Sequence, residues 1–408
     1  MAKTVILFSI LFFPSLLFSQ TEKDSLQFPK EKNLYNTKDM ADVYHSIFKK
    51  HKKTDTISSR KADFAILPAA GYTLQTGFAG VISANMGFHT KKNENQKISN
   101  INTSVTYTQY KQILAPFYAN IWFPNNHYNW ISDMKYMDYP SDVYGLNSRR
   151  LSTDANSNEG YGISYRFVKI HESVLRTVFE NFYLGGGFYY DQFWDIKIID
   201  TEGNRVNRLL TRQLSTNEKA VGVVAKAMYD SRLNQINPSN GWYANVVFNP
   251  SFSFLGSTKD WSTLQIDVRK YFHFPANSQN VLAFWGFAWL TTSNNHPSYL
   301  FLPSTAWDDQ YNTGRGYIQS RFRGKNMLYY ENEYRFNLTK NGLLGGVVFG
   351  NVQTFSGDLS TEYRKLMVGY GLGLRVKLNK KTGTNVCIDY GFGDYNSRGF
   401  FVNLGEVF

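Results

Sequence analysis

The fold follows from one stretch, Val368-Gly369-Tyr370-Gly371-Leu372-Gly373-Leu374-Arg375-Val376. Apolar side chains alternate in it with small or charged ones. Because successive residues of a β-strand point to opposite faces, the pattern predicts a strand with one apolar face and one polar face. A transmembrane β-barrel needs strands of this kind, since lipid surrounds it and its lumen is polar.

The same alternation recurs along most of the chain, in segments separated by turn-forming residues. These segments predict strands near 64–74, 77–90, 97–109, 113–124, 127–138, 159–168, 180–190, 219–230, 241–253, 260–272, 280–291, 324–337, 342–352, 365–377, 382–392 and 397–408. We therefore predict an all-β fold, a transmembrane antiparallel β-barrel of about 16 strands that occupies residues 63–408. An even number of strands is typical of single-chain bacterial barrels.

The lengths of the connections support this assignment. Such barrels have short periplasmic turns and long outer loops in strict alternation. Short connections at 93–96, 124–126, 277–279, 340–342 and 379–381 all fall on one side, and long ones at 139–158, 191–218, 292–323 and 353–364 all fall on the other. Two connections fit poorly, because 75–76 is short for an outer loop and 169–179 is long for a periplasmic turn.

The N-terminus predicts export. Lys3 precedes an apolar run from Val5 to Phe18, and polar residues follow. The run is too short to cross a bilayer as a helix, which indicates a cleavable signal peptide over residues 1–20. Export and the barrel pattern together predict an outer-membrane location. The alternative is a short membrane anchor.

Residues 21–62 predict a short periplasmic extension. Met40, Val43, Tyr44, Ile47 and Phe48 fall at helical spacing, which indicates a short amphipathic helix. The segment could plug the barrel mouth, lie on the membrane through its lysines, or act as a disordered tether.

Composition and charge exclude several classes of protein. The chain is 42% hydrophobic and 17% aromatic with 31 Gly, and its mean hydropathy is -0.38. A membrane barrel fits these values, although a secreted β-sandwich or propeller could share them. The net charge of +12 would suggest nucleic-acid binding in a cytosolic protein, but an exported chain points instead to a basic lumen or to rims that contact anionic lipid. The single cysteine, Cys387, excludes an intramolecular disulfide.

The C-terminus ends in an aromatic residue. The alternation of the last segment predicts that Phe400, Val402, Leu404 and Phe408 face outward. We interpret Leu404, Gly405 and Phe408 as a C-terminal assembly signal.

Several motifs in the second half of the chain occur in a characteristic order. They are Tyr229-Asp230-Ser231-Arg232 with Asn237-Pro238-Ser239-Asn240-Gly241-Trp242-Tyr243, then Arg315-Gly316-Tyr317, Gly324-Lys325-Asn326-Met327 with Glu333-Tyr334-Arg335-Phe336, and the closing Asn403-Leu404-Gly405-Glu406-Val407-Phe408. In this order they resemble the barrel of the BamA/TamA superfamily of outer-membrane assembly proteins, also called the bacterial surface antigen family. The resemblance covers residues 64–408 and is strongest in the C-terminal half. Residues 21–62 leave no room for the periplasmic receptor (POTRA) domains of many members.

The resemblance implies a site inside the barrel. In the family the sixth outer loop folds into the lumen, and an arginine of that loop meets acidic residues of the inner wall. Here that loop latch would consist of Arg315, Gly316, Tyr317, Glu333 and Asn351, where Asn351 stands at a position that commonly carries an inward Asp. An amide can accept a hydrogen bond from Arg315 but supplies no charge, so we expect Glu333 to be the main anchor.

Strand parity adds inner-wall charges at Glu331, Arg335 and Asp389. The alternative to a latch is a basic loop exposed to solvent.

Two functions remain open at this stage. The resemblance implies a barrel that assists insertion of outer-membrane proteins or translocation across the outer membrane, with membrane lipids, client proteins or assembly-complex subunits as partners. The alternative is a passive or plugged pore that works with partners supplied in trans, whose conductance would rise when residues 292–323 are deleted. The seven histidines stand in no recognisable catalytic or metal-ligand motif, so we predict no enzyme activity, no cofactor, no metal site and no nucleic-acid partner.

Overall fold

A computed structural model describes residues 37–47, 63–73, 76–91, 96–144, 160–198, 215–308, 312–357, 365–380 and 382–408. The predicted signal peptide and most of the segment 21–62 lie outside these ranges. The chain divides into Met1–Thr37 and Lys38–Phe408, and the second unit contains everything that follows.

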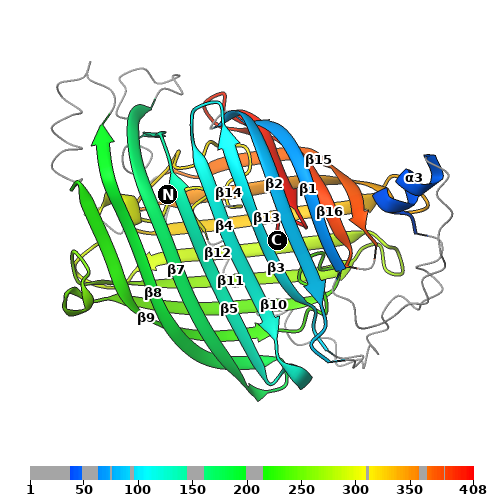
Figure 1. Ribbon diagram of the computed structural model, residues 1–408, viewed down its shortest axis with the longest axis horizontal. Coiled ribbons are helices and arrows are strands. Elements are labelled where there is room, and N and C mark those ends of the chain that lie inside the picture. Colours follow the sequence, from blue (N-terminus) through cyan, green and yellow to red (C-terminus); the bar gives the residue numbers. More distant parts are fainter. Residues whose placement is uncertain are drawn as a thin grey trace, which may run out of the picture. The chain divides into compact units, whose positions relative to one another are not determined.

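This unit is one antiparallel β-barrel. Its sheet has 17 strands, and sixteen remain when the three-residue strand β6 is set aside. The bounds are β1 Asp63–Thr73, β2 Gly77–Phe88, β3 Ser99–Thr108, β4 Ile113–Trp122, β5 Tyr128–Asp138, β6 Ser141–Val143, β7 Tyr161–Phe179, β8 Phe182–Ile198, β9 Asn217–Asp230, β10 Gly241–Ser251, β11 Trp261–His273, β12 Val281–Thr291, β13 Met327–Asn337, β14 Leu344–Phe355, β15 Met367–Asn379, β16 Thr384–Gly393 and β17 Arg398–Leu404. In Figure 1, β2 to β9 form the near wall and β10 to β14 run behind them.

Each long strand pairs with its neighbour along the chain, as in β14 and β15, where Val352 lies opposite Val368. The two faces separate as the alternation predicts. Tyr370 and Leu372 on β15 are exposed, whereas Arg375 on β15 and Phe349 on β14 are buried. The prediction of an all-β antiparallel barrel is confirmed. The barrel is stable in lipid because apolar side chains cover its outer surface and the backbone N–H and C=O groups form hydrogen bonds between strands.

Predicted boundaries are wrong at three strands. The strand predicted to end at residue 190, β8, continues to Ile198. Residues 169–179 are not a turn, because β7 continues to Phe179 and pairs with β8. The turn is Glu180-Asn181, where Asn181 has a φ of 59°. The last strand ends at Leu404 and not at Phe408, for reasons given with the site.

Strand direction defines two ends of the barrel. We call the end that carries the connections after β2, β4, β7, β9, β11, β13 and β15 the short-turn end, and the opposite one the loop end. The helix α3, Met40–Ile47, lies at the short-turn end, where Lys380 Nζ donates to Asp42 Oδ2 at 2.6 Å. Asp39 caps this helix through the backbone N–H of Asp42 at 3.0 Å. Among the described residues, no helix is long and apolar enough to cross a bilayer.

The barrel has a seam between its first and last strands. Backbone pairs join β1 to β2 and β16 to β17, but the described residues show no such pairing between β1 and β17. The Cα atoms of these two strands still approach within 8 Å. Pro68 within β1 lacks the N–H that a ladder partner would need.

Candidate functional site

The loop between β12 and β13 is a folded body in its own right. It begins with a short 3-10 helix, Tyr299–Phe301. Its two limbs are joined by backbone hydrogen bonds from Thr305 to Phe322 and from Ser320 to Thr305, both 3.0 Å. Arg323, also buried, donates to the carbonyls of Tyr299 at 2.8 Å and Leu300 at 2.9 Å. These hydrogen bonds within the loop hold its shape independently of its contacts with the barrel wall.

Aromatic contacts place this loop against the inner face of the barrel. Phe301 meets Phe193 of β8 edge to face at 5.0 Å, and Trp307 meets Phe167 of β7 at 5.9 Å. Nearer the loop tip, Tyr317 packs edge to face on Phe322 at 5.2 Å. Aromatic pairs at these distances stabilise a packed core beyond the area they bury. The loop therefore fills part of the lumen.

Arg315 carries the charge of the loop tip and meets three carboxylates. Its guanidinium lies 2.5 Å from Glu333 and 2.6 Å from Asp389, and it also contacts Glu331. All four side chains are at most 1% exposed. The face of the Phe349 ring lies 3.8 Å from the guanidinium carbon. A buried arginine requires such partners, because an unpaired charge out of water is costly.

Asn351 contributes differently from what the sequence suggests. We expected its amide to accept a hydrogen bond from the Arg315 guanidinium. Instead Asn351 Nδ2 donates to the Arg315 backbone carbonyl at 2.8 Å. The reason is that Asp389 of β16 supplies the carboxylate on that side, so Asn351 meets the loop backbone.

Glycines on both partners allow the loop tip to lie directly on the wall. Gly316 has a φ of 106°, and a Cβ there would lie 2.5 Å from the Phe392 carbonyl oxygen. On the wall, a Cβ at Gly391 would lie 2.7 Å from the Gly316 nitrogen, and one at Gly369 would lie 2.6 Å from the Arg315 carbonyl oxygen. The run of small inward residues on β15 and β16 was a sequence signal for this close approach. Tyr317 completes the seat by donating to the Val368 carbonyl at 2.5 Å.

The charges around Arg315 form a closed ring. Asp389 also pairs with Arg375, and Glu333 also pairs with Arg335. Glu406 closes the ring, at 2.8 Å from Arg375 and 3.7 Å from Arg335. Parity placed Glu331, Glu333, Arg335 and Asp389 on the inner wall, and the structure has them there. No pattern in the sequence indicates that Asp389 touches Arg315 or that Glu406 and Arg375 belong to the cluster.

The C-terminal tail, residues 405–408, turns into the lumen, so the prediction that Phe408 faces outward is wrong. Phe408 is 2% exposed, its ring lies 5.3 Å from that of Trp285, and Arg335 Nη2 donates to its carbonyl oxygen at 2.7 Å. Two causes act together: Gly405 takes a φ of 91° that turns the chain, and the ring of arginines holds Glu406. Leu404 stays at the end of β17, half-buried. An assembly-signal role for Leu404, Gly405 and Phe408 stays a prediction.

The charge of Glu406 is strongly stabilised. Burial raises the pKa of this carboxyl, but Arg375 and Arg335 outweigh burial and lower the pKa to about 2. Hydrogen bonds from Asn385 and Arg375 to the carboxylate act in the same direction. The tail is therefore anchored as an anion at neutral pH.

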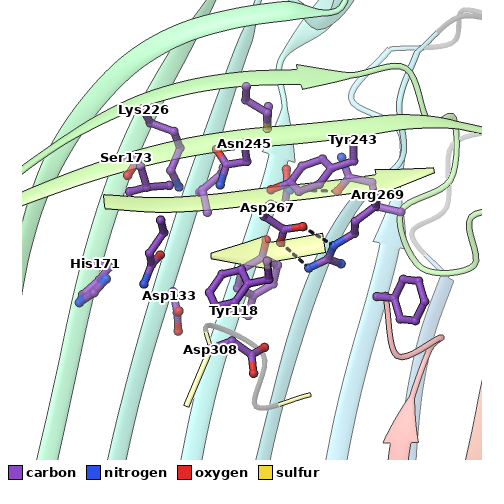
Figure 2. Close-up of a pocket in the computed structure, with 18 of the residues that line it drawn as sticks. Tyr118, Asp133, His171, Ser173, Lys226, Tyr243, Asn245, Asp267, Arg269 and Asp308 are labelled. Carbon is purple, nitrogen blue, oxygen red and sulfur yellow. Dashed lines mark hydrogen bonds and ion pairs between the residues drawn. The ribbon is translucent and has the colours of Figure 1, made fainter. Parts of the chain in front are cut away.

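The rest of the lumen holds a pocket with about 1220 Å³ of empty space, part of which is open to solvent. Two ion pairs lie at its wall: Asp267 with Arg269 at 2.7 Å and Asp133 with Lys169 at 2.6 Å. Figure 2 shows Asp267 and Arg269 pointing toward each other, with Tyr243 beside them and Asp308 of the loop across the cavity. Sequence reasoning missed this cavity. Within the described residues, no group of three or more His, Cys, Asp or Glu is placed to hold a metal ion.

Comparisons with known proteins agree with this architecture. The model of the Omp85 superfamily domain matches residues 95–408. Among solved structures, BamA from Haemophilus ducreyi lacking POTRA domains 1–3 aligns with 13% identity and a TM-score of 0.52, over 85% of this chain and 70% of that one. CdiB from Acinetobacter baumannii aligns with 13% identity and a TM-score of 0.53, over 85% of this chain and 60% of that one. The comparison with curated proteins gives no match. At these identities the two structures speak for the fold alone.

Proposed function

The chain belongs to the Omp85 superfamily, and from that premise we propose that it assists the insertion of β-barrel proteins into the outer membrane. Membership of the family supports a barrel of the outer-membrane assembly or translocation type. Insertase activity, client proteins and partner subunits are our proposal.

One observation supports the proposal above others: among the described residues, β1 and β17 share none of the backbone pairs that join other neighbouring strands. Unpaired N–H and C=O groups at a strand edge can accept another strand. In a bilayer these groups are costly if unsatisfied. A client strand that paired there would satisfy them, so the seam can act as a template for a growing barrel.

The Arg315 cluster does not bridge the seam. Its carboxylates lie on β13 and β16, so opening between β1 and β17 leaves Arg315 and its carboxylates in place. The latch that we propose around Arg315 would hold the loop while the seam opens.

The test is folding of an unrelated outer-membrane barrel into liposomes that contain the purified protein. The client is diluted from urea, and its folding is followed by heat-modifiability on gels. We expect the protein to accelerate folding over liposomes without it. An unchanged rate would refute the insertase proposal.

A matched pair of disulfides assigns the effect to the seam. In a Cys387→Ala background, paired cysteines on β1 and β17 should close the seam and abolish the acceleration, and reduction should restore it. The control pair is Val352→Cys with Val368→Cys, which are already opposite one another on β14 and β15. If both disulfides act alike, the seam is not the site of insertion.

A plugged pore is the second candidate, and the polar pocket in the lumen favours it. Its test is conductance in planar bilayers: a plugged pore should conduct once the segments that fill its lumen are removed, and a barrel that stays closed after their removal would refute it.

A further inference from the structure

The connection between β9 and β10 makes an excursion that the strands do not need. Asp230 lies opposite Tyr243 in the ladder, and the Ser231 N–H donates to the Trp242 carbonyl at 2.9 Å. Two residues are enough to join strands paired in this way. The chain instead inserts residues 232–241 at this point. Residues 232–241 are therefore not needed to join β9 to β10, and we look for another role for them.

This segment crosses the short-turn end and reaches other walls of the barrel. In the turn between β15 and β16, the Thr382 carbonyl accepts from Asn234 Nδ2 at 2.8 Å and the Gly383 carbonyl accepts from Asn237 Nδ2 at 3.0 Å. On β13, Arg335 Nη1 donates to the Pro238 carbonyl at 3.0 Å. These contacts join residues about 100 to 150 positions apart in the chain.

The segment also reaches the first strands. Asn120 of β4 donates to Gln235 Oε1 at 2.9 Å. A Cβ added at Gly87 of β2 would lie 3.9 Å from Ile236 Cδ1. Ile236 is buried, and its carbonyl accepts the Glu406 N–H at 2.9 Å. The segment thus contacts strands on several sides of the lumen at once.

The excursion is internally braced. Arg232 forms a two-pronged pair with Asp230 at 3.0 and 3.1 Å, and its guanidinium stacks on Tyr243 at 4.1 Å. Asn234 Oδ1 accepts the N–H groups of Ile236 at 2.8 Å and Asn237 at 3.1 Å, which fixes a tight turn. Asp230 and Arg232 are both buried. A segment held in this way keeps its shape across the opening.

We propose that residues 232–241 are an inner plug, which closes the lumen at the short-turn end as the loop 292–326 closes it from the loop end. The lining of the cavity agrees with two inserts: Arg232 and Gln235 come from the inner plug, Glu406 and Phe408 from the tail, and Asp308 from the loop. The inner plug acts as a permeability barrier independently of any insertase role. Deletion of the outer loop then leaves the barrel shut.

Conductance in planar bilayers tests this with four proteins: wild type, deletion of 292–323, replacement of Arg232–Gly241 by Asn-Gly, and both changes together. We expect each single change to leave conductance within about twofold of wild type and the double change to raise it by roughly tenfold or more. If deletion of 292–323 alone conducts as well as the double change, the inner plug is refuted. If the double change conducts no better than wild type, the proposal also fails.

Two controls keep the result interpretable. In the first, residues 275–279 of the β11–β12 turn are replaced by Asn-Gly in the loop-deleted background, which shortens a turn at the same end, and conductance should not rise. In the second, Asn234→Ala with Asn237→Ala in that background removes two cross-barrel bonds without changing chain length. This variant should show flickering openings above the loop-deleted parent, and a trace identical to the parent would contradict the proposal. Heat-modifiability confirms that each variant is folded.

Discussion

The two inserts that enter the lumen are held by different physics. The loop 292–326 is anchored by a buried arginine among three carboxylates. The inner plug is anchored mainly by neutral side-chain amides that donate to backbone carbonyls. Removal of one partner from a buried ion cluster leaves an uncompensated charge, whereas loss of one neutral hydrogen bond costs far less. Single substitutions in the anchor of the loop 292–326 should therefore cause large losses of stability, and single substitutions in the inner plug should cause small ones.

The two inserts meet at Arg335 and the C-terminal tail. Arg335 pairs with Glu333 in the ring around the loop tip and donates to Pro238 of the inner plug and to Phe408 of the tail. The Glu406 backbone also donates to Ile236. A change in either insert therefore tests the difference between the two kinds of anchor.

Changes at Arg315 should have the largest effects. Arg315→Gln leaves Glu331 without its arginine and leaves Glu333 and Asp389 with one arginine each, and we expect a loss of about 3–5 kcal/mol in the free energy of unfolding. Urea unfolding in detergent, followed by heat-modifiability, measures the loss. Arg323→Gln is the control, because Arg323 is equally buried but donates to the carbonyls of Tyr299 and Leu300. Equal losses in both variants would show that the carboxylates are not what makes Arg315 important.

Charge exchange sharpens the same point. Arg315→Glu should weaken the barrel further, and the added change Glu333→Arg should restore only part of the loss, because Glu331 and Asp389 remain. A double variant no more stable than Arg315→Glu would remove Glu333 from the latch.

Glu406→Gln should show its effect through pH. The pKa of Glu406 is about 2 in the folded protein against an ordinary value of 4.5, so its contribution is complete above about pH 4.5 and is lost as pH falls toward 2. The shift corresponds to a contribution on the order of 3 kcal/mol. The difference in unfolding free energy between wild type and Glu406→Gln should shrink across this range. A difference that stays constant with pH would contradict the ring.

The only cysteine of the chain gives an independent readout of the tail at neutral pH. Cys387 is fully buried, and its Sγ lies 3.1 Å from the Gly405 carbonyl oxygen. Glu406→Gln should loosen the tail and raise the rate at which a water-soluble thiol reagent modifies Cys387. Unchanged protection would mean that the tail stays in place without its carboxylate.

Gly316→Ala should have a smaller effect on stability than the changes above. The added Cβ would lie 2.5 Å from the Phe392 carbonyl oxygen, at a φ of 106°, and we expect a loss of about 1–3 kcal/mol. The measurement is urea unfolding, with Gly80→Ala as control, because a Cβ at Gly80 meets no atom within 4 Å. Equal effects at the two positions would contradict the close seat of the loop tip.

Asn237→Ala should have the smallest effect. It removes one amide-to-carbonyl bond of the inner plug, and we expect a loss of about 1 kcal/mol. Ser239→Ala, at an exposed position of the same turn, should be close to neutral. A loss as large as that of Arg315→Gln would abolish the contrast between the two inserts.

The strands and their faces could be predicted from the sequence because both depend on local spacing. The alternation in Val368–Val376 places Tyr370 outward and Arg375 inward, and the structure agrees. For the same reason parity placed Glu331 and Glu333 on the inner wall. The family resemblance then directed Arg315 toward them.

The partners across the lumen could not be predicted. Asp389 meets Arg315 from a strand 74 positions away, and the donors of the inner plug bind backbone carbonyls, which every residue carries. The direction of the tail could not be predicted, because alternation up to Phe408 is equally compatible with an outward-facing strand. The chain turns inward because Gly405 adopts a left-handed conformation and two arginines on other strands bind Glu406.

The existence of the strands, their lipid-facing sides and the basic loop tip can be predicted from the chain, because these features depend on side chains a few residues apart. Which luminal groups meet, the inward direction of the tail and the pocket between the two inserts become visible only in the folded barrel. These features depend on distances across the barrel, which are set by the pairing of all its strands and leave no local pattern in the chain.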